Sequence, residues 1–162
     1  MQSHPNVRAV REALDAAGAR DGSGRPSEIR LLPSAAHTAA AAAEALGVTV
    51  GAIANSLVFA ADDAPLLVLT SGAHRVDTAG LAASLGVTRL RRATPEFVRQ
   101  HTGQVIGGVA PLGHPAPLRT LVDAALAGYD EVWAAGGVPQ AVFPTTYAEL
   151  LRITAGTPTE VA

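Results

Sequence analysis

The sequence predicts a mixed α/β (α+β) protein, on three observations. Helical and strand patterns are interleaved along the chain rather than grouped in blocks. The clearest strand pair, residues 56–61 and 65–70, is joined by the three-residue loop Asp62-Asp63-Ala64, which predicts an antiparallel hairpin in a central sheet. No repeat and no linker interrupts the 162 residues, so residues 1–162 are expected to form a single domain.

Capping residues mark the expected helices. In chain order these are residues 5–19, 38–46, 77–85, a segment opening at Thr94-Pro95, and 145–154. Thr38, Asp77 and Thr94 suit N-caps, and Thr145 or Thr146 caps the last helix. A helical turn is expected at residues 49–54. The tail after Gly156 is expected to be loose.

Short apolar runs predict the remaining strands. They are residues 28–32, 88–91, 118–122, 131–134 and 141–143. Both strands of the hairpin are apolar throughout, so both of its faces should be largely covered.

Composition excludes several kinds of chemistry. The chain is 48% hydrophobic and 16% charged, as in a soluble globular protein. It has no cysteine, which excludes disulfides, thiolate metal sites and a cysteine nucleophile. It also has no lysine, because all twelve basic residues are arginine. The net charge of −2 argues against a protein that grips long nucleic acid, so any contact with nucleic acid should be local.

No apolar run of about 18 residues predicts a membrane span. Residues 1–11 are polar and lack a signal-peptide core. We therefore expect a cytoplasmic protein that does not contact membranes.

A glycine-rich segment, residues 103–114, is the best local candidate for a functional site. Within it, Gly107-Gly108-Val109-Ala110-Pro111 can turn several backbone N–H groups toward one point, where they would bind an anion or a developing oxyanion. The alternative is a tight connection between a helix and a strand.

A second candidate is Asn55-Ser56, two polar residues directly before an apolar strand. Asn55 offers amide donors and an acceptor, and Ser56 offers a hydroxyl. The alternative is a turn or a helix C-cap, a position that asparagine often occupies.

Other polar residues carry weaker signals. Asp77, at the end of residues 71–77, fits a helix cap better than a catalytic group. Arg89, Arg91 and Arg92 alternate like an exposed strand edge, which could contact phosphate or only solvent. The five histidines show no i, i+3 or i, i+4 spacing on one helix, so no metal site is predicted.

Taken in order, these segments resemble the YbaK/EbsC family, the prolyl-tRNA synthetase-associated domains. The resemblance covers about residues 37–154. It is carried by His37-Thr38 before an alanine-rich helix, by the hairpin that opens Ser56-Leu57-Val58-Phe59, by Arg75-Val76-Asp77, by the segment Gly107 to Gly113, by Asp130-Glu131-Val132-Trp133, and by residues 150–154.

The resemblance implies a curved, mainly antiparallel sheet flanked by helices, and hydrolysis of the ester that joins a wrong amino acid to the 3′ end of tRNA. It implies no cofactor, no metal and no protein nucleophile. Gly107, Gly108 and Pro111 would shape the loop that holds the scissile carbonyl, and Asn55 would contact the substrate. Substrate-binding residues would be Ser56, Val109, Ala110, His37 and Ala135. The expected partners are the 3′ end of an aminoacyl-tRNA and an aminoacyl-tRNA synthetase.

The chain departs from the family pattern at defined positions. Relatives usually carry lysine where this chain has Asn55, which can donate a hydrogen bond but has no charge. Ala110 and Ala135 each stand where relatives often have serine, and residues 138–142 replace a more polar run. The leading hypothesis is a deacylase that edits mischarged tRNA in trans. The alternative is a non-catalytic module that binds aminoacyl-tRNA or a small ligand.

Overall fold

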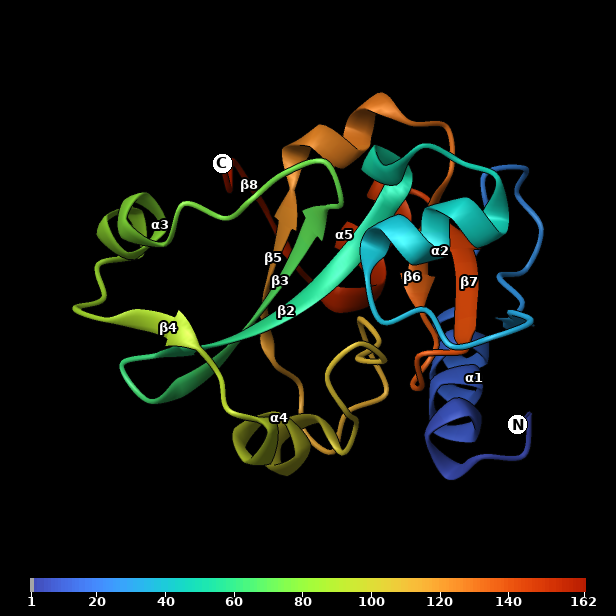
Figure 1. Cartoon of the computed structure of the whole chain (residues 1–162), viewed down its shortest axis with the longest axis horizontal. Coiled ribbons are helices and arrows are strands. Elements are labelled where there is room, and N and C mark those ends of the chain that lie inside the picture. The colour runs from blue at the N-terminus through green and yellow to red at the C-terminus, as the bar shows by residue number, and fades with distance from the viewer. Residues whose placement is uncertain (1) are drawn as a thin grey trace.

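An eight-stranded sheet forms the centre of the computed structural model, which describes residues 2–162 (Figure 1). The strand order is β1-β7-β6-β2-β3-β5-β8, and β4 pairs with β2. The strands are β1 (Arg30–Leu31), β2 (Ile53–Ala61), β3 (Ala64–Ser71), β4 (Leu90–Arg92), β5 (Arg119–Asp123), β6 (Val132–Ala135), β7 (Ala141–Thr145) and β8 (Thr157–Thr159). Four of the seven strand pairs are antiparallel, which confirms the expected mixed α/β class with a mainly antiparallel sheet.

The predicted hairpin lies at the middle of this sheet. Strands β2 and β3 pair antiparallel from Ala54–Ser71 to Ala61–Ala64. The expected three-residue loop is wrong, because Ala64 already pairs with Ala61 and only Asp62 and Asp63 form the turn. Both turn residues have positive φ, 47° and 71°, as the two-residue turn that matches the strand twist requires.

Helices cover both faces of the sheet. The helices are α1 (Pro5–Ala17), α2 (Ala39–Leu46), α3 (Thr78–Leu85), α4 (Pro95–Thr102) and α5 (Tyr147–Thr154). Short 3₁₀ helices are η1 (Val50–Ala52) and η2 (Ala124–Gly128). Four of the expected N-caps are confirmed, since the side chains of Thr38, Asp77, Thr94 and Thr146 each accept a bond from the first turn.

Successive side chains of β2 point to opposite faces of the sheet, and their packing partners show which helices cover each face. On one face Ile53 packs with α2, and Phe59 packs with Leu81 of α3. On the other face Ala54 and Val58 join a core with residues of α1, α4 and α5. Figure 1 accordingly shows α2 in front of β7 and α5 behind the central strands.

Several expected boundaries are corrected. Helix α1 ends at Ala17 rather than residue 19, because Gly18 adopts the left-handed conformation at φ 60°. The helical turn near residue 50 stops at Ala52, since Ile53 already pairs in β2. All seven expected strands begin or end one or more residues from their expected limits. For example, β1 is confined to Arg30–Leu31, β2 already begins at Ile53, and β7 continues to Thr145.

The C-terminal tail is ordered, so the expectation of a loose tail is wrong. Strand β8 pairs in parallel with β5, and Val161 is buried against the α3 side of the core. The main-chain oxygen of Val161 also accepts a bond of 2.7 Å from the Asp77 N–H. No helix among residues 2–162 is long and apolar enough to cross a membrane.

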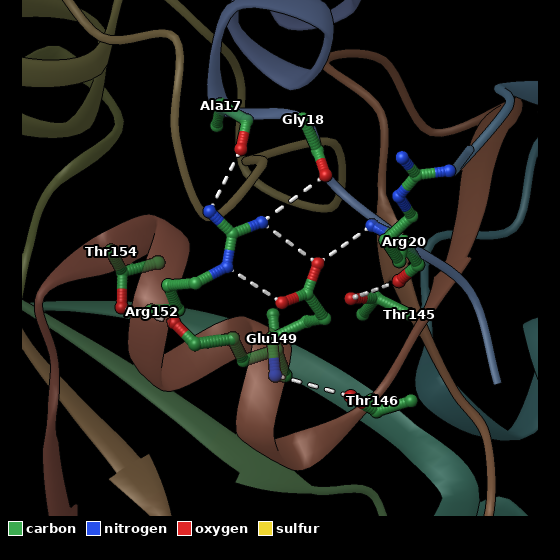
Figure 2. Close-up of polar contacts among 9 residues, drawn as sticks. Ala17, Gly18, Arg20, Thr145, Thr146, Glu149, Arg152 and Thr154 are labelled. Atoms are coloured by element: carbon green, nitrogen blue, oxygen red, sulfur yellow. Dashed lines mark hydrogen bonds and ion pairs between the residues drawn. The ribbon is translucent and has the colours of Figure 1, made fainter. Parts of the chain in front are cut away.

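An ion pair on α5 joins this helix to the end of α1 (Figure 2). The Arg152 Nε donates to Glu149 Oε2 at 2.7 Å, and the guanidinium also donates to the main-chain oxygens of Ala17 and Gly18. The other Glu149 oxygen, Oε1, accepts from the Arg20 N–H at 2.7 Å and from Arg152 Nη2 at 2.9 Å. These bonds satisfy carbonyls that the end of α1 leaves without helical partners.

Candidate functional site

The pocket of interest opens where two parallel strands separate. Strands β2 and β6 pair only at Ile53–Trp133 and Ala54–Ala134. The next residues of the two strands, Asn55 and Ala135, are not paired with each other, and both line the pocket. The other edge of β2 is occupied by β3, so the separation leaves an opening only on the β6 side.

The same edge of β2 is covered again further along. Strand β4 pairs with Phe59–Ala61, and Val58 accepts a bond from the Ala93 N–H. Between the two pairings, residues 55–57 have no strand partner on this edge among residues 2–162. Because backbone groups alternate in direction along a strand, the Ser56 N–H and C=O face this gap.

Ser56 also carries an unsatisfied hydroxyl. Its Oγ is buried and has no hydrogen-bond partner within residues 2–162. Buried hydroxyls normally have a partner, so an exception is informative. Ser56 lines the pocket, and its hydroxyl is therefore a candidate partner for a bound ligand.

The glycine loop closes the pocket opposite β2. Gly107 and Val109 both line it. The N–H groups of Gly108 and Ala110 are already used, by Val105 O at 2.9 Å and by Gln104 Oε1 at 2.7 Å. Within residues 107–111, the N–H groups left for a ligand are therefore those of Gly107 and Val109. The expected anion-binding group of backbone N–H donors is reduced to these two.

Both glycines of the pair are required by the backbone. Gly107 has φ 92°, in the region that favours glycine, and a Cβ there would lie 3.4 Å from His37 Nδ1. At Gly108 a Cβ would lie 2.6 Å from the Val138 main chain. The first glycine sets the bend of the loop, and the second lets it pack against the β6–β7 turn.

Two side chains fix the loop from behind, the buried Gln104 and the half-buried His114. Gln104 is only 2% exposed and accepts the Ala110 N–H. His114 Nε2 lies 2.8 Å from the Ala110 main-chain oxygen. Burial lowers the pKa of His114, an effect that its bond to Ala110 only partly offsets. The imidazole is therefore neutral near pH 7 and donates through Nε2.

The start of α2 forms a third wall. His37, Thr38 and Ala39 line the pocket, and Thr38 caps the helix by accepting the Ala41 N–H at 3.1 Å. The free N–H groups of a first helical turn and the helix dipole favour negative charge at this end. The sequence marks α2 by its cap but gives no sign that its N-terminus meets the glycine loop.

The structure brings six of the predicted site residues together. They are His37, Asn55, Ser56, Gly107, Val109 and Ala135. The other three, Gly108, Ala110 and Pro111, are not among the residues that line the pocket. Sequence reasoning missed the apolar walls, which are Ala36, Ala42, Ile53, Trp133 and Val142. In the sequence these residues are distinguished only by being hydrophobic, which is equally true of any core residue.

The pocket is small, and no carboxylate of the described residues lines it. Its cavity volume is about 40 Å³, a few times the roughly 10–15 Å³ that one water molecule needs on the same measure. His37 is its only titratable lining residue. Hydrogen-bond donors from a loop, a helix end and two side chains converge there, a pattern suited to polarising a carbonyl group.

A family model described as an aminoacyl-tRNA editing domain matches residues 33–153. A proline–tRNA ligase of Levilactobacillus brevis is 34% identical over 87 residues, which are 54% of this chain and 15% of the ligase. The chain thus spans a small part of that enzyme's length. The uncharacterized protein YwhH of Bacillus subtilis is 28% identical over 127 residues, covering 78% of this chain and 80% of YwhH.

Two solved structures extend over nearly the whole chain. One, a candidate trans-editing enzyme for prolyl-tRNA synthetase, is 42% identical with a TM-score of 0.87, covering 97% of this chain and 96% of the other. The second, hypothetical protein APE2540, is 25% identical with a TM-score of 0.83 and covers 94% of this chain and 98% of the other.

Proposed function

Because the chain belongs to the aminoacyl-tRNA editing domain family, we propose that it hydrolyses the ester of a mischarged aminoacyl-tRNA in trans. The YbaK-type resemblance of the sequence is confirmed by this match and by the structure with 42% identity. The observation that supports the proposal best is the placement of Ser56 and the glycine loop across one small pocket.

In the proposed reaction, the amino acid enters the pocket with its ester carbonyl toward the loop. A water oxygen attacks the carbonyl carbon, and the negative charge that develops on the carbonyl oxygen is stabilised by the N–H groups of Gly107 and Val109. The C–O bond to the ribose then breaks, and the ribose oxygen takes up the proton that the attacking water loses. The free amino acid then leaves. Each oxyanion donor is typically worth about 10² to 10³ in rate.

Asn55 and Ser56 would position the substrate. The Asn55 amide replaces the charged lysine of the family with a neutral donor, and the Ser56 hydroxyl has no competing partner within residues 2–162. His37, beside Gly107, would contact the substrate from the α2 side. Ala135 would limit the size of the accepted side chain, as the small volume of the pocket suggests. Gly108, Ala110 and Pro111 would act by shaping the loop.

The candidate trans-editing enzyme among the relatives suggests tRNA charged by prolyl-tRNA synthetase as the substrate and that synthetase as a partner. We therefore propose that residues 1–162 act as one editing domain in the cytoplasm, where translation takes place. The test is a deacylation screen with tRNAs charged with labelled wrong amino acids. Release of label from a subset with small side chains is expected, and no release from any charged tRNA would refute an enzyme.

A second candidate is a module that binds aminoacyl-tRNA without cleaving it. The neutral Asn55 in place of lysine is the observation that favours it. Binding of a mischarged tRNA without turnover would distinguish this module from the deacylase.

A further inference from the structure

A second hollow lies next to the pocket, between β2 and the segment that leads into α3. Leu57, Phe59 and Val76 give it an apolar part, and His74, Arg75 and Arg92 give it a basic part. None of the residues that line the hollow is acidic.

His74 is held in place by a buried carboxylate. Its Nδ1 lies 2.8 Å from Asp123 Oδ2, and Asp123 is only 1% exposed. Asp123 also accepts the N–H groups of Ser71 at 2.9 Å and Ala125 at 3.0 Å. With its Nδ1–H donating to the carboxylate, His74 offers Nε2 to a ligand as a hydrogen-bond acceptor.

The arginines of the hollow differ from their neighbours. The Arg92 guanidinium lies 5.8 Å from the centre of the Phe59 ring, a cation–π contact that helps to hold it at the hollow. Arg91, next to it on β4, instead lies 3.3 Å from Asp63 at the hairpin turn. Neither Arg75 nor Arg92 forms an ion pair within residues 2–162.

Asn55 connects the hollow to the proposed ester site. It lines both, and it is directly opposite Thr70, whose hydroxyl lies 3.4 Å from Asp123 Oδ2. A ligand whose reacting end enters the pocket can therefore extend past Asn55 into the hollow. An apolar floor with basic groups beside it suits a nucleotide, whose base has an apolar face and whose phosphate is an anion.

We propose that this hollow binds one nucleotide of the single-stranded 3′ end of tRNA, with its phosphate on Arg75 and Arg92. The inference rests on the proposed function, since it names where the strand runs beyond the ester. It reconciles a chain of net charge −2 with a polyanionic substrate, because the contact is confined to one small patch.

The first test measures binding of an uncharged RNA oligonucleotide ending in CCA, by fluorescence anisotropy at several salt concentrations. Arg75→Ala and Arg92→Ala should each weaken binding about threefold to tenfold. Each should also make the slope of log affinity against log salt concentration shallower by roughly the amount that one phosphate contact contributes. Arg91→Ala is the matched control and should bind as the wild type does. Equal losses in all three variants, or no loss in any, would overturn the proposal.

Inorganic phosphate added as a competitor separates a nucleotide site from a general anion site. At millimolar concentration it should displace the oligonucleotide only weakly. Full displacement at that concentration, with the same sensitivity to Arg75→Ala, would assign the hollow to free phosphate instead and overturn the nucleotide proposal.

The second test compares two substrates that carry the same ester. Arg75→Ala and Arg92→Ala should raise KM for an aminoacyl-tRNA but leave kcat/KM for an aminoacyl-adenosine, which lacks the upstream phosphates, unchanged. Equal losses on both substrates would show that the arginines act on the chemistry or the fold, and the proposal would fail. If the wild type cleaves neither ester, the proposed function fails. The oligonucleotide experiment still tests whether the hollow binds a nucleotide.

Discussion

Asn55 and Ala135 lie at the point where two parallel strands separate, and they line the same pocket although they are 80 positions apart in sequence. Each follows directly on a paired residue, Ala54 in β2 and Ala134 in β6. The pocket is therefore a consequence of sheet topology. Strand β2 exchanges one partner for another along a single edge and leaves a short unpaired gap in between.

The unsatisfied hydroxyl of Ser56 gives a prediction that separates function from stability. Ser56→Ala removes a buried polar atom that has no partner within residues 2–162, so the free energy of unfolding should be unchanged or rise by up to about 1 kcal/mol. Deacylation should nevertheless become slower, because the substrate loses a hydrogen bond. Urea unfolding and single-turnover deacylation measure the two effects.

Ser71→Ala is the matched control for Ser56→Ala. Ser71 is also buried, but its hydroxyl donates to the Gly51 main-chain oxygen at 2.8 Å. Its loss should lower stability by about 1–3 kcal/mol, because it leaves a buried acceptor unpaired. If Ser56→Ala proves as destabilising as Ser71→Ala, its hydroxyl has a structural role and not the one proposed.

His114 should make stability depend on pH. Burial holds its pKa below the ordinary value of 6.5, so the unfolded chain takes up a proton first as pH falls. The resulting stability is fully present above about pH 6.5 and declines as pH falls toward the lower folded pKa. His114→Gln should flatten this decline between pH 6.5 and 5 in urea unfolding. A wild type and variant with parallel pH profiles would contradict the argument.

The ion pair of Glu149 with Arg152 predicts a second loss of stability at lower pH (Figure 2). The hydrogen bond from Arg152 is the largest cause of the lowered pKa of Glu149, so the stabilisation is present above about pH 4.5 and is lost as pH falls through the folded pKa. Glu149→Gln should lower stability at pH 7 by up to about 1 kcal/mol, the range of solvent-screened ion pairs, and weaken the acid dependence. Glu12→Gln, an exposed change on α1, should have neither effect.

Much of the fold could be predicted because local signals agreed with one another. The caps Thr38, Asp77 and Thr94 and the apolar hairpin all lie where the pattern places them. The C-terminal tail could not be predicted. Strand β8 is held by pairing with β5 and by burial of Val161, both contacts with residues distant in sequence.

Six of the nine candidate site residues line one pocket, but the geometry of that pocket could not be predicted. The order of motifs pointed to Asn55, Ser56 and the glycine loop, yet nothing local shows that Gln104 takes up the Ala110 N–H and leaves Gly107 and Val109 to face the pocket. Nor does the sequence show that β2 loses its partner at residue 55, because this depends on where β4 and β6 dock.

The most direct test of the proposed function is the single-turnover deacylation rate of the wild type, Asn55→Ala and Asn55→Lys on the same mischarged tRNA. With the N–H groups of Gly107 and Val109 supporting the reaction, the wild type should show measurable turnover. Asn55→Ala should be slower, and Asn55→Lys should keep or extend the activity, because a charged donor makes a hydrogen bond roughly twice as strong. A wild type that binds the tRNA without turnover, together with an Asn55→Lys variant that cleaves it, would contradict the enzyme and leave the binding module.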